Sequence, residues 1–210
     1  MTTQTVEIFY SFQCPYSYLA MDRYAELESK FDIKVLWQPF SAKVAGKGFP
    51  TTPVPPEKIS YIREDSIRLA QEMNMPLAMT DSWPENEFDP EKSLRGALIA
   101  SDMEVAIEYN IKMFQQWWEE GQNPNDSAFI VQLCEELDID LNEFTALSNS
   151  SDTRERVKNI FKRGKKYGIF ETPTILINEE RFVGLDRIDA AEKKLRAMGL
   201  AKKPRASAAA

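Results

Sequence analysis

Hydrophobic positions at the start of the chain follow a strand pattern, then a helix pattern, then a strand pattern again. Residues 5–12 (TVEIFYSF) are rich in β-branched and aromatic side chains, which is typical of a buried strand. Residues 15–29 carry an apolar side, and Pro15 suits the first helical position because the N–H there needs no intrahelical partner. Residues 33–37 (IKVLW) predict a second strand. Together these elements predict a βαβ unit with parallel strands and a right-handed crossover.

The middle of the chain has helical spacing and no strand pattern. Residues 41–56 are rich in glycine and proline and predict a loop. Farther on, Asp89 and Pro90 supply a helix cap and a first helical residue. The predicted helices cover residues 57–74, 89–118 with a break, 127–138 and 141–148, with connections at 75–88 and 121–126.

After this helical block the pattern becomes mixed again. A basic helix, capped by a residue within 149–152, is followed by two strands that form a hairpin and by a final helix. Two glycines are placed to end the two helices. These elements are a helix at 153–167 before Gly168, strands at 174–177 and 181–183, and a helix from Asp186 to Met198 before Gly199.

The order of the elements predicts the fold class. A βαβ half and an αββα half make a four-stranded mixed sheet flanked by helices, which is the thioredoxin arrangement. We therefore predict an α/β, thioredoxin-like fold (βαβ…αββα) with an inserted all-helical domain. Its predicted parts are a thioredoxin-like domain at 1–45 and 152–200, a helical insertion at 57–150, and a disordered tail of low complexity at 201–210.

Composition and charge exclude several classes of function. Of 210 residues, 43% are hydrophobic and 28% are charged, as in a globular protein with a sizeable core. Histidine is absent, which excludes a Ser-His-Asp triad, a Cys-His protease centre and His-ligated zinc. A net charge of −7 argues against nucleic-acid binding. For the basic helix at 153–167, the leading interpretation is a solvated face, and the alternative is a surface that attracts an anionic substrate.

The N-terminal sequence and the hydropathy predict the compartment. MTTQTVEIFY has neither the basic nor the apolar region of a secretory signal, and no apolar run approaches the ~18 residues of a membrane span. We therefore expect a cytoplasmic protein without a membrane partner, in a compartment that keeps thiols reduced. Two cysteines, Cys14 and Cys134, are too few for a zinc knuckle or a disulfide scaffold.

Cys14 is the candidate reactive residue. It lies between a predicted strand and a helix that begins with Pro15, where unpaired amides and the helix dipole favour a thiolate. We therefore expect a lowered pKa for its thiol. Most free cysteines are instead buried hydrophobic residues. That interpretation suits Cys134, which lies on the apolar side of a predicted helix (IVQLCEELDI).

Two segments of the chain, SFQCPYSYLA at 11–20 and GIFETPTILINEERFVGLDRID at 168–189, resemble the DsbA-like branch of the thioredoxin superfamily. The opening motif SFQCPYSYLA is similar to that of 2-hydroxychromene-2-carboxylate isomerases and kappa-class glutathione transferases, which typically reads Ser-Pro-Tyr-Ser-Tyr/Trp-Leu. Residues 168–189 (GIFETPTILINEERFVGLDRID) resemble their closing segment, in which Gly-Val/Leu-Pro-Thr precedes two strands and a Phe-Gly-x-Asp-Arg turn. The two motifs bracket the helical block, and the resemblance spans residues 5–198.

The resemblance implies a glutathione site. Pro173 would be cis and opposite Cys14, and the backbone of Thr172 would pair with the cysteinyl backbone of glutathione. Leu185 and Asp186 would bind the γ-glutamyl end. Asp186 can equally be the N-cap of the last helix, and the two roles are compatible.

Other positions match the family in part. Lys58 aligns with a lysine that meets the glycine carboxylate of glutathione, and it can also be an ordinary solvated lysine. Cys14 replaces the family's serine, which allows a mixed disulfide with glutathione, and an expected asparagine has no counterpart between residues 40 and 57. Ser17 replaces the second cysteine of a Cys-x-x-Cys motif, and Cys134 is a core residue in this interpretation, so dithiol exchange is disfavoured.

We therefore expect a glutathione-dependent isomerase or transferase that acts on a small, apolar, conjugated electrophile derived from an aromatic compound. Its expected partners are glutathione and that electrophile, without nucleic acid or metal, and a homodimer is compatible with the sequence. One alternative is a DsbA-like thiol–disulfide oxidoreductase working through Cys14 alone; another is a binding module that has kept only the fold. Aromatic residues predicted to lie in the core, on a dimer surface or along an apolar cleft are Tyr61, Trp83, Phe88, Trp117 and Trp118.

Overall fold

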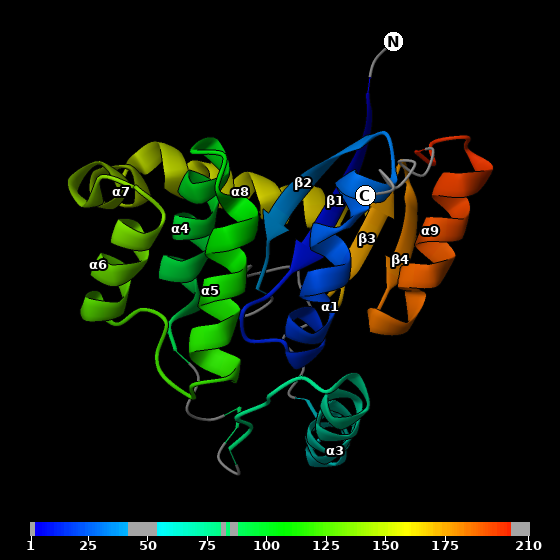
Figure 1. Cartoon of the computed structure of the whole chain (residues 1–210), viewed down its shortest axis with the longest axis horizontal. Helices are drawn as coiled ribbons and strands as arrows, with labels where there is room; N and C mark the ends of the chain where they lie inside the picture. Colours follow the sequence, from blue (N-terminus) through cyan, green and yellow to red (C-terminus); the bar gives the residue numbers. More distant parts are fainter. Residues whose placement is uncertain (1–2, 42–53, 81–82, 85–87, 203–210) are drawn as a thin grey trace, which may run out of the picture.

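A four-stranded mixed sheet forms the centre of the molecule, with strand order β2-β1-β3-β4 (Figure 1). The computed structural model describes residues 3–41, 54–80, 83–84 and 88–202. β1 is parallel to β2 and antiparallel to β3, and β3 and β4 form a hairpin. The predicted thioredoxin-like sheet is therefore confirmed. The strands are β1 (Gln4–Tyr10), β2 (Ile33–Pro39), β3 (Thr174–Ile177) and β4 (Glu180–Val183).

Alternate residues of β1 point to two different cores. Val6, Ile8 and Tyr10 are buried with residues of α1 (Pro15–Ala25) and α9 (Ile188–Ala197). Phe9 is buried on the other face, with residues of α4 (Pro90–Asp102) and α8 (Ser151–Lys166). Figure 1 shows α1 in front of β1 and α8 behind it. Both faces of the sheet are thus covered, as the period of two along a strand requires.

The predicted helical block lies between β2 and β3 in the chain. Glu104, with a φ of 62°, separates α4 from α5 at the predicted break. Asp89 caps α4 by accepting a hydrogen bond from the Glu91 amide at 3.0 Å, and Ser150 caps α8 in the same way. In Figure 1, α4 to α7 lie to one side of the sheet and α3 lies below it. The remaining helices of the block are α3 (Pro56–Met73), α5 (Ala106–Trp118), α6 (Ser127–Glu136) and α7 (Leu141–Ser148).

Buried polar contacts join the helical block to the β1–α1 turn. The Tyr10 hydroxyl donates to Asn110 Oδ1 of α5 at 2.8 Å, and Trp118 Nε1 donates to the Phe12 carbonyl at 2.9 Å. Phe12 also packs against Phe114, with 5.0 Å between the ring centroids. One core cluster therefore runs from the sheet into the helical block. The domain bounds drawn from the sequence stay a prediction.

The basic helix is held by ion pairs. Arg163 of α8 pairs with Glu7, a buried residue of β1, and Arg156 pairs with Asp102 at the end of α4. A buried carboxylate needs such a partner because its desolvation is costly. Part of the predicted solvated face therefore fastens α8 to the sheet and to α4.

Several boundaries differ from the prediction. The first strand ends at Tyr10, and the first helix is divided at Glu26 into α1 and α2 (Leu27–Lys30). Gly168 and Gly199 have positive φ, as predicted for residues that end helices. Parts of the predicted loop at 41–56, of the connection at 75–88 and of the tail at 201–210 lie outside the described residues.

The N-cap prediction for Asp186 is wrong. Leu185–Arg187 form a 3-10 turn, η1, and α9 begins only at Ile188. Arg187 takes the N-cap position and makes no side-chain capping hydrogen bond. The chain tightens into three-residue turns before the helix starts, so Asp186 lies one position too early to cap it.

Within the described part of the chain, no helix has the length and apolar character of a membrane span.

Candidate active site

Cys14 occupies the position between β1 and α1 that the sequence predicts. It has extended backbone angles at the N-cap of α1, and Pro15 is the first residue of the helix. The Cys14 carbonyl accepts the amides of Ser17 and Tyr18 at 3.0 and 3.2 Å. The residue is partly exposed, whereas Cys134 in α6 is buried in the core. Among the described residues, Cys14 is the only cysteine open to solvent.

The turn before β3 lies beside the Cys14 thiol. The Thr172–Pro173 bond is cis, and Cys14 Sγ donates to the Thr172 carbonyl at 3.1 Å across 158 positions of sequence. No hydrogen bond within the described residues involves the Thr172 amide. The thiol thus uses the carbonyl of this residue and leaves its N–H available to a ligand.

The protonation of Cys14 differs from the prediction. Burial raises the pKa of the Cys14 thiol above its ordinary value, while hydrogen bonds from the side chains of Thr172 and Ser17 and from the backbone of Ser17 and Tyr16 lower it to a smaller extent. The expectation of a lowered pKa is therefore wrong for the free protein. The helix N-terminus favours a thiolate, but the loss of water around the sulfur disfavours the charge more strongly.

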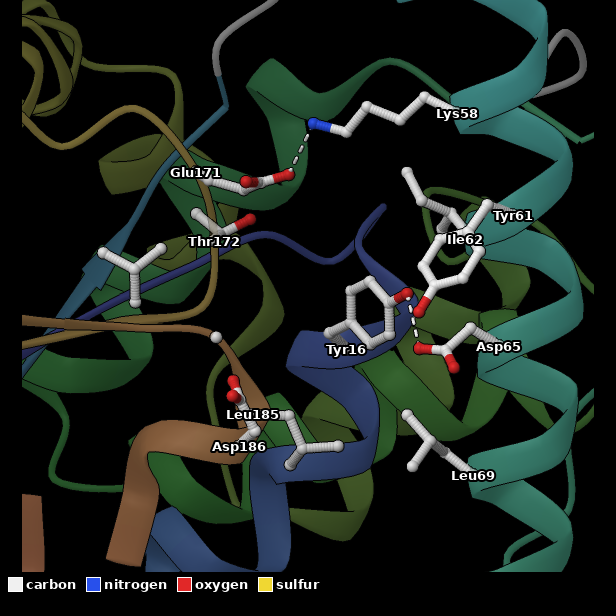
Figure 2. A pocket seen from close by; sticks show the side chains of 12 residues that line it. Tyr16, Lys58, Tyr61, Ile62, Asp65, Leu69, Glu171, Thr172, Leu185 and Asp186 are labelled. Carbon is white, nitrogen blue, oxygen red and sulfur yellow. Dashed lines mark hydrogen bonds and ion pairs between the residues drawn. The ribbon is translucent and has the colours of Figure 1, made fainter. Parts of the chain in front are cut away.

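A cavity of about 570 Å³ opens beside this turn (Figure 2). Its volume lies within the ~300–1,000 Å³ range of small-molecule sites. The cavity brings together Lys58, Thr172, Leu185 and Asp186, four of the five residues predicted to bind glutathione. Cys14 and Pro173 are not part of its lining, and Cys14 approaches it through Thr172. The remaining lining residues are Tyr16, Tyr61, Ile62, Asp65, Leu69, Glu171, Val183 and Gly184.

One face of α3 forms a wall of the cavity. Lys58, Tyr61, Asp65 and Leu69 recur at spacings of three and four residues, so they lie on one side of the helix. Figure 2 shows Lys58 pointing toward Glu171 and Asp65 pointing toward Tyr16 of α1. Tyr61 is exposed and lies along the cavity, as one of the sequence interpretations has it. Trp83, Phe88 and Trp118 are instead buried in the core.

Tyr16 and Asp65 form a contact that the sequence does not reveal. The Tyr16 hydroxyl donates to Asp65 Oδ2 at 2.9 Å, inside the cavity (Figure 2). Burial, and then the Asp65 carboxylate, raise the pKa of Tyr16, so its phenol stays protonated. The position of Tyr16 two residues after Cys14 is a signal that could have identified it, whereas Asp65 is recognisable only once α3 is placed against α1.

Residues 5–196 match the DSBA-like thioredoxin domain family. The chain belongs to this family. A relative, 2-hydroxychromene-2-carboxylate isomerase of Sphingobium xenophagum, is 22% identical over 197 residues, which cover 92% of this chain and 98% of the relative. Relatives of this DSBA-like chain therefore include proteins named as isomerases.

Solved structures confirm the DSBA-like fold. A structure of 2-hydroxychromene-2-carboxylate isomerase has a TM-score of 0.77 at 21% identity and covers 93% of this chain and 96% of that chain. The cytosolic disulfide reductase DsbM from Pseudomonas aeruginosa with GSH has a TM-score of 0.65 at 17% identity and covers 91% of this chain and 99% of that chain. Both likenesses extend over the sheet and the helical block together.

Ion pairs occupy the charged groups at both ends of the cavity in this DSBA-like protein. Lys58 Nζ lies 3.1 Å from Glu171 Oε1, and both side chains are about half exposed. Asp186 lies 3.3 Å from Arg187 and is largely exposed. Exposed pairs of this kind are worth only ~0–1 kcal/mol, so a ligand can replace them. Lys58 lines the cavity, and its charge is already partly matched by Glu171.

Proposed function

We propose that the protein is a glutathione-dependent isomerase or transferase that acts on a conjugated, aromatic-derived electrophile. The observation that carries this proposal is the Cys14 thiol at the edge of a 570 Å³ cavity, 3.1 Å from the Thr172 carbonyl. The side chains of Tyr61, Ile62 and Leu69 give the cavity apolar surface, and charged groups, Lys58 and Asp186 among them, also line it. Such a cavity suits an apolar ligand with a polar terminus. The proposal includes a cytoplasmic location, where glutathione is kept reduced.

The residues around the cavity fit glutathione in part. The Thr172 amide can donate to a peptide carbonyl of glutathione, as an extended backbone would require. The Asp186 carboxylate can bind the α-ammonium of the γ-glutamyl end, and Leu185 lies beside it. Lys58 can meet the glycine carboxylate only by sharing its charge with Glu171.

Bound glutathione supplies a thiolate sulfur that adds to a conjugated carbon. The former double bond becomes a single bond and can rotate, and elimination then restores both the double bond and the thiolate. The role of this chain is to hold that sulfur as a thiolate and to exclude water. Because the pKa of Cys14 is raised, its thiol keeps a proton that it can donate to a neighbouring thiolate. The Tyr16 hydroxyl lies in the same cavity, and Asp65 accepts its hydrogen bond.

A second candidate is a thiol–disulfide oxidoreductase with one cysteine. It is favoured by the partial exposure of Cys14. In this reaction Cys14 thiolate attacks a protein–glutathione disulfide, a new S–S bond forms to the glutathione sulfur, and the protein thiolate leaves. A second glutathione thiolate then attacks that bond, which releases oxidised glutathione and restores Cys14. Ser17 provides no second thiol, so this route depends on glutathione for release.

Cys14→Ser separates the two candidates. In the isomerase or transferase, serine replaces one hydrogen-bond donor by another, so conversion of an aryl-substituted α,β-unsaturated ketone with glutathione should fall by no more than about tenfold. In the oxidoreductase, the substitution removes the nucleophile, and the release of glutathione from a glutathionylated peptide should fall by several orders of magnitude. Both rates are measured for wild type, Cys14→Ser and the control Cys134→Ser.

Calorimetry with glutathione provides the primary check. Absence of glutathione binding by the wild-type protein would overturn both candidates. A Cys14→Ser protein that binds glutathione normally but no longer converts the ketone would overturn the first and favour the second. Intact mass after treatment with oxidised glutathione shows whether Cys14 forms the mixed disulfide.

A further inference from the structure

Charged groups of both signs line the cavity, but they are unequal in number. Among its described lining residues, Lys58 is the one cation, and Asp65, Glu171 and Asp186 are three carboxylates. Lys58 Nζ already lies 3.1 Å from Glu171 Oε1 (Figure 2). A ligand carboxylate that entered here would have to compete with Glu171 for this ammonium group.

The two other carboxylates are also paired. Arg68 Nη1 lies 2.8 Å from Asp65 Oδ1, and Arg187 Nη2 lies 3.3 Å from Asp186 Oδ2. Neither arginine belongs to the described lining of the cavity. Their charges therefore balance the two aspartates from outside. Within the described residues, the site presents no cation that lacks a carboxylate partner.

We propose that the cavity selects against electrophiles that carry a carboxylate and takes uncharged or cationic ones, with Glu171 as the residue that determines this specificity. The inference rests on the proposed function for the identity of the reaction, and it adds the charge of the substrate. An ionised carboxylate gains stability only beside an available cation, and the one cation of the described lining, Lys58, is already engaged by Glu171. The relatives named 2-hydroxychromene-2-carboxylate isomerase are named for an acid. The substrate of this chain is of another charge class.

Glu171 controls this selectivity because it competes directly for Lys58. Removal of its charge frees the ammonium group for a ligand carboxylate and removes one like charge from the cavity. The pair is half exposed, so the effect is that of an exposed ion pair, ~0.2–1 kcal/mol, or about a one-and-a-half- to fivefold change in rate or affinity. The same change should strengthen the binding of glutathione through its glycine carboxylate.

Modification of Cys14 by small charged reagents tests the selectivity without glutathione. The two probes are the trimethylammonioethyl and the sulfonatoethyl methanethiosulfonates. In each case Cys14 thiolate attacks the sulfenyl sulfur, a new S–S bond forms, and methanesulfinate leaves. The rates are followed by the mass of the Cys14-bearing peptide, so that Cys134 does not contribute. Each rate is divided by the rate of the same reagent with 2-mercaptoethanol, which removes intrinsic reactivity.

The cationic reagent should react several-fold faster than the anionic one after this correction, and the ratio should approach one at high salt because exposed charges are screened. Glu171→Gln should lower the ratio by about one-and-a-half- to fivefold. Glu155→Gln is the matched control, because it removes a similarly exposed carboxylate that pairs with Lys162 on α8. That variant should keep the wild-type ratio.

A corrected ratio at or below one in the wild-type protein, or an unchanged ratio in Glu171→Gln, would overturn the proposed selectivity. Because neither reagent contains glutathione, this result would leave the glutathione-dependent reaction standing. Conversely, a protein that shows the expected ratios but binds no glutathione in calorimetry would overturn the proposed function and leave the charge selectivity of the cavity intact.

Discussion

The Cys14 sulfur lies between two opposing influences. The start of α1 directs amides toward it, which favours a thiolate, and the surrounding side chains remove water, which favours a thiol. Burial outweighs the helix N-terminus and raises the pKa of the thiol, and the Thr172 carbonyl accepts the hydrogen bond that the thiol donates. At neutral pH the residue is therefore a hydrogen-bond donor first and a nucleophile second.

This protonation state predicts how the reactivity of Cys14 depends on pH. Burial disfavours the thiolate, so the pKa of Cys14 lies above the ordinary thiol value of about 8.5. Labelling by iodoacetamide should therefore be slow at pH 7. The rate should keep rising through pH 9. A matched measurement in denaturant should return a midpoint near ~8.5. A labelling rate that is already constant below pH 7 would mean that the helix N-terminus lowers the pKa of Cys14 more than burial raises it.

At the scale of elements, the site depends on η1 as much as on α1 and α3. The Gly184 amide donates to the Pro173 carbonyl at 2.8 Å, which holds the turn before η1 against the turn before β3. Gly184 has a φ of 101°, a backbone conformation that other residues rarely adopt. A Cβ atom there would lie 2.7 Å from Asp186 Oδ1. Because Gly184 has no Cβ atom, the Asp186 carboxylate can occupy its observed position beside the cavity.

Gly184→Ala should lower both stability and ligand binding. We expect a loss of about 1–3 kcal/mol in the free energy of unfolding, and a weaker affinity for glutathione because the Asp186 carboxylate must move. Gly199→Ala is the control, since its φ is 75° but nothing lies within 4 Å of the added methyl group. It should lose stability and keep its affinity. Equal affinities of the two variants in calorimetry would count against a role for Asp186.

Periodicity predicts the elements well, because each element buries one face. The order of strands and helices, the caps Asp89 and Ser150, and the contact between the Cys14 and Thr172 segments all follow from local patterns and the family motifs. The cap at Asp186 fails because a 3-10 turn delays the helix, and local sequence does not distinguish the two.

The chemistry of the site is less accessible to sequence reasoning. The raised pKa of Cys14 depends on how many atoms surround the sulfur, which a motif does not contain. The contacts of Asp65 with Tyr16 and of Glu171 with Lys58 each join segments that are distant in the chain. Such pairs become visible only when α3 is placed across the cavity from the turn before β3.

At the scale of the whole molecule, sheet and helical block share one core. Tyr10 and Asn110 are both almost fully buried, and their 2.8 Å hydrogen bond joins β1 to α5. The Asn110 Nδ2 atom has no partner within the described residues. The Tyr10–Asn110 hydrogen bond therefore positions the helical block against the sheet, and it leaves the Asn110 Nδ2 donor unsatisfied.

Tyr10→Phe should destabilise the protein by about 1–3 kcal/mol, because it leaves the Asn110 carbonyl buried without a donor. The double variant Tyr10→Phe/Asn110→Leu should be less destabilised than the sum of the single variants, since both buried polar groups are then removed. Urea unfolding of the four proteins gives these values, and a single transition is expected from the shared core. Additive losses would show that the two side chains do not depend on each other.

The distance in sequence between the two halves of the site has a consequence for folding during synthesis. Cys14 and Thr172 are 158 positions apart, so at ~5–20 residues per second the thiol is synthesised about 8–32 s before the carbonyl that accepts its hydrogen bond. During that interval β1 can pair with β2, but its other edge waits for β3. The nascent chain thus carries an open strand edge and an unshielded sulfur together, and release of the finished C-terminal segment closes both at once.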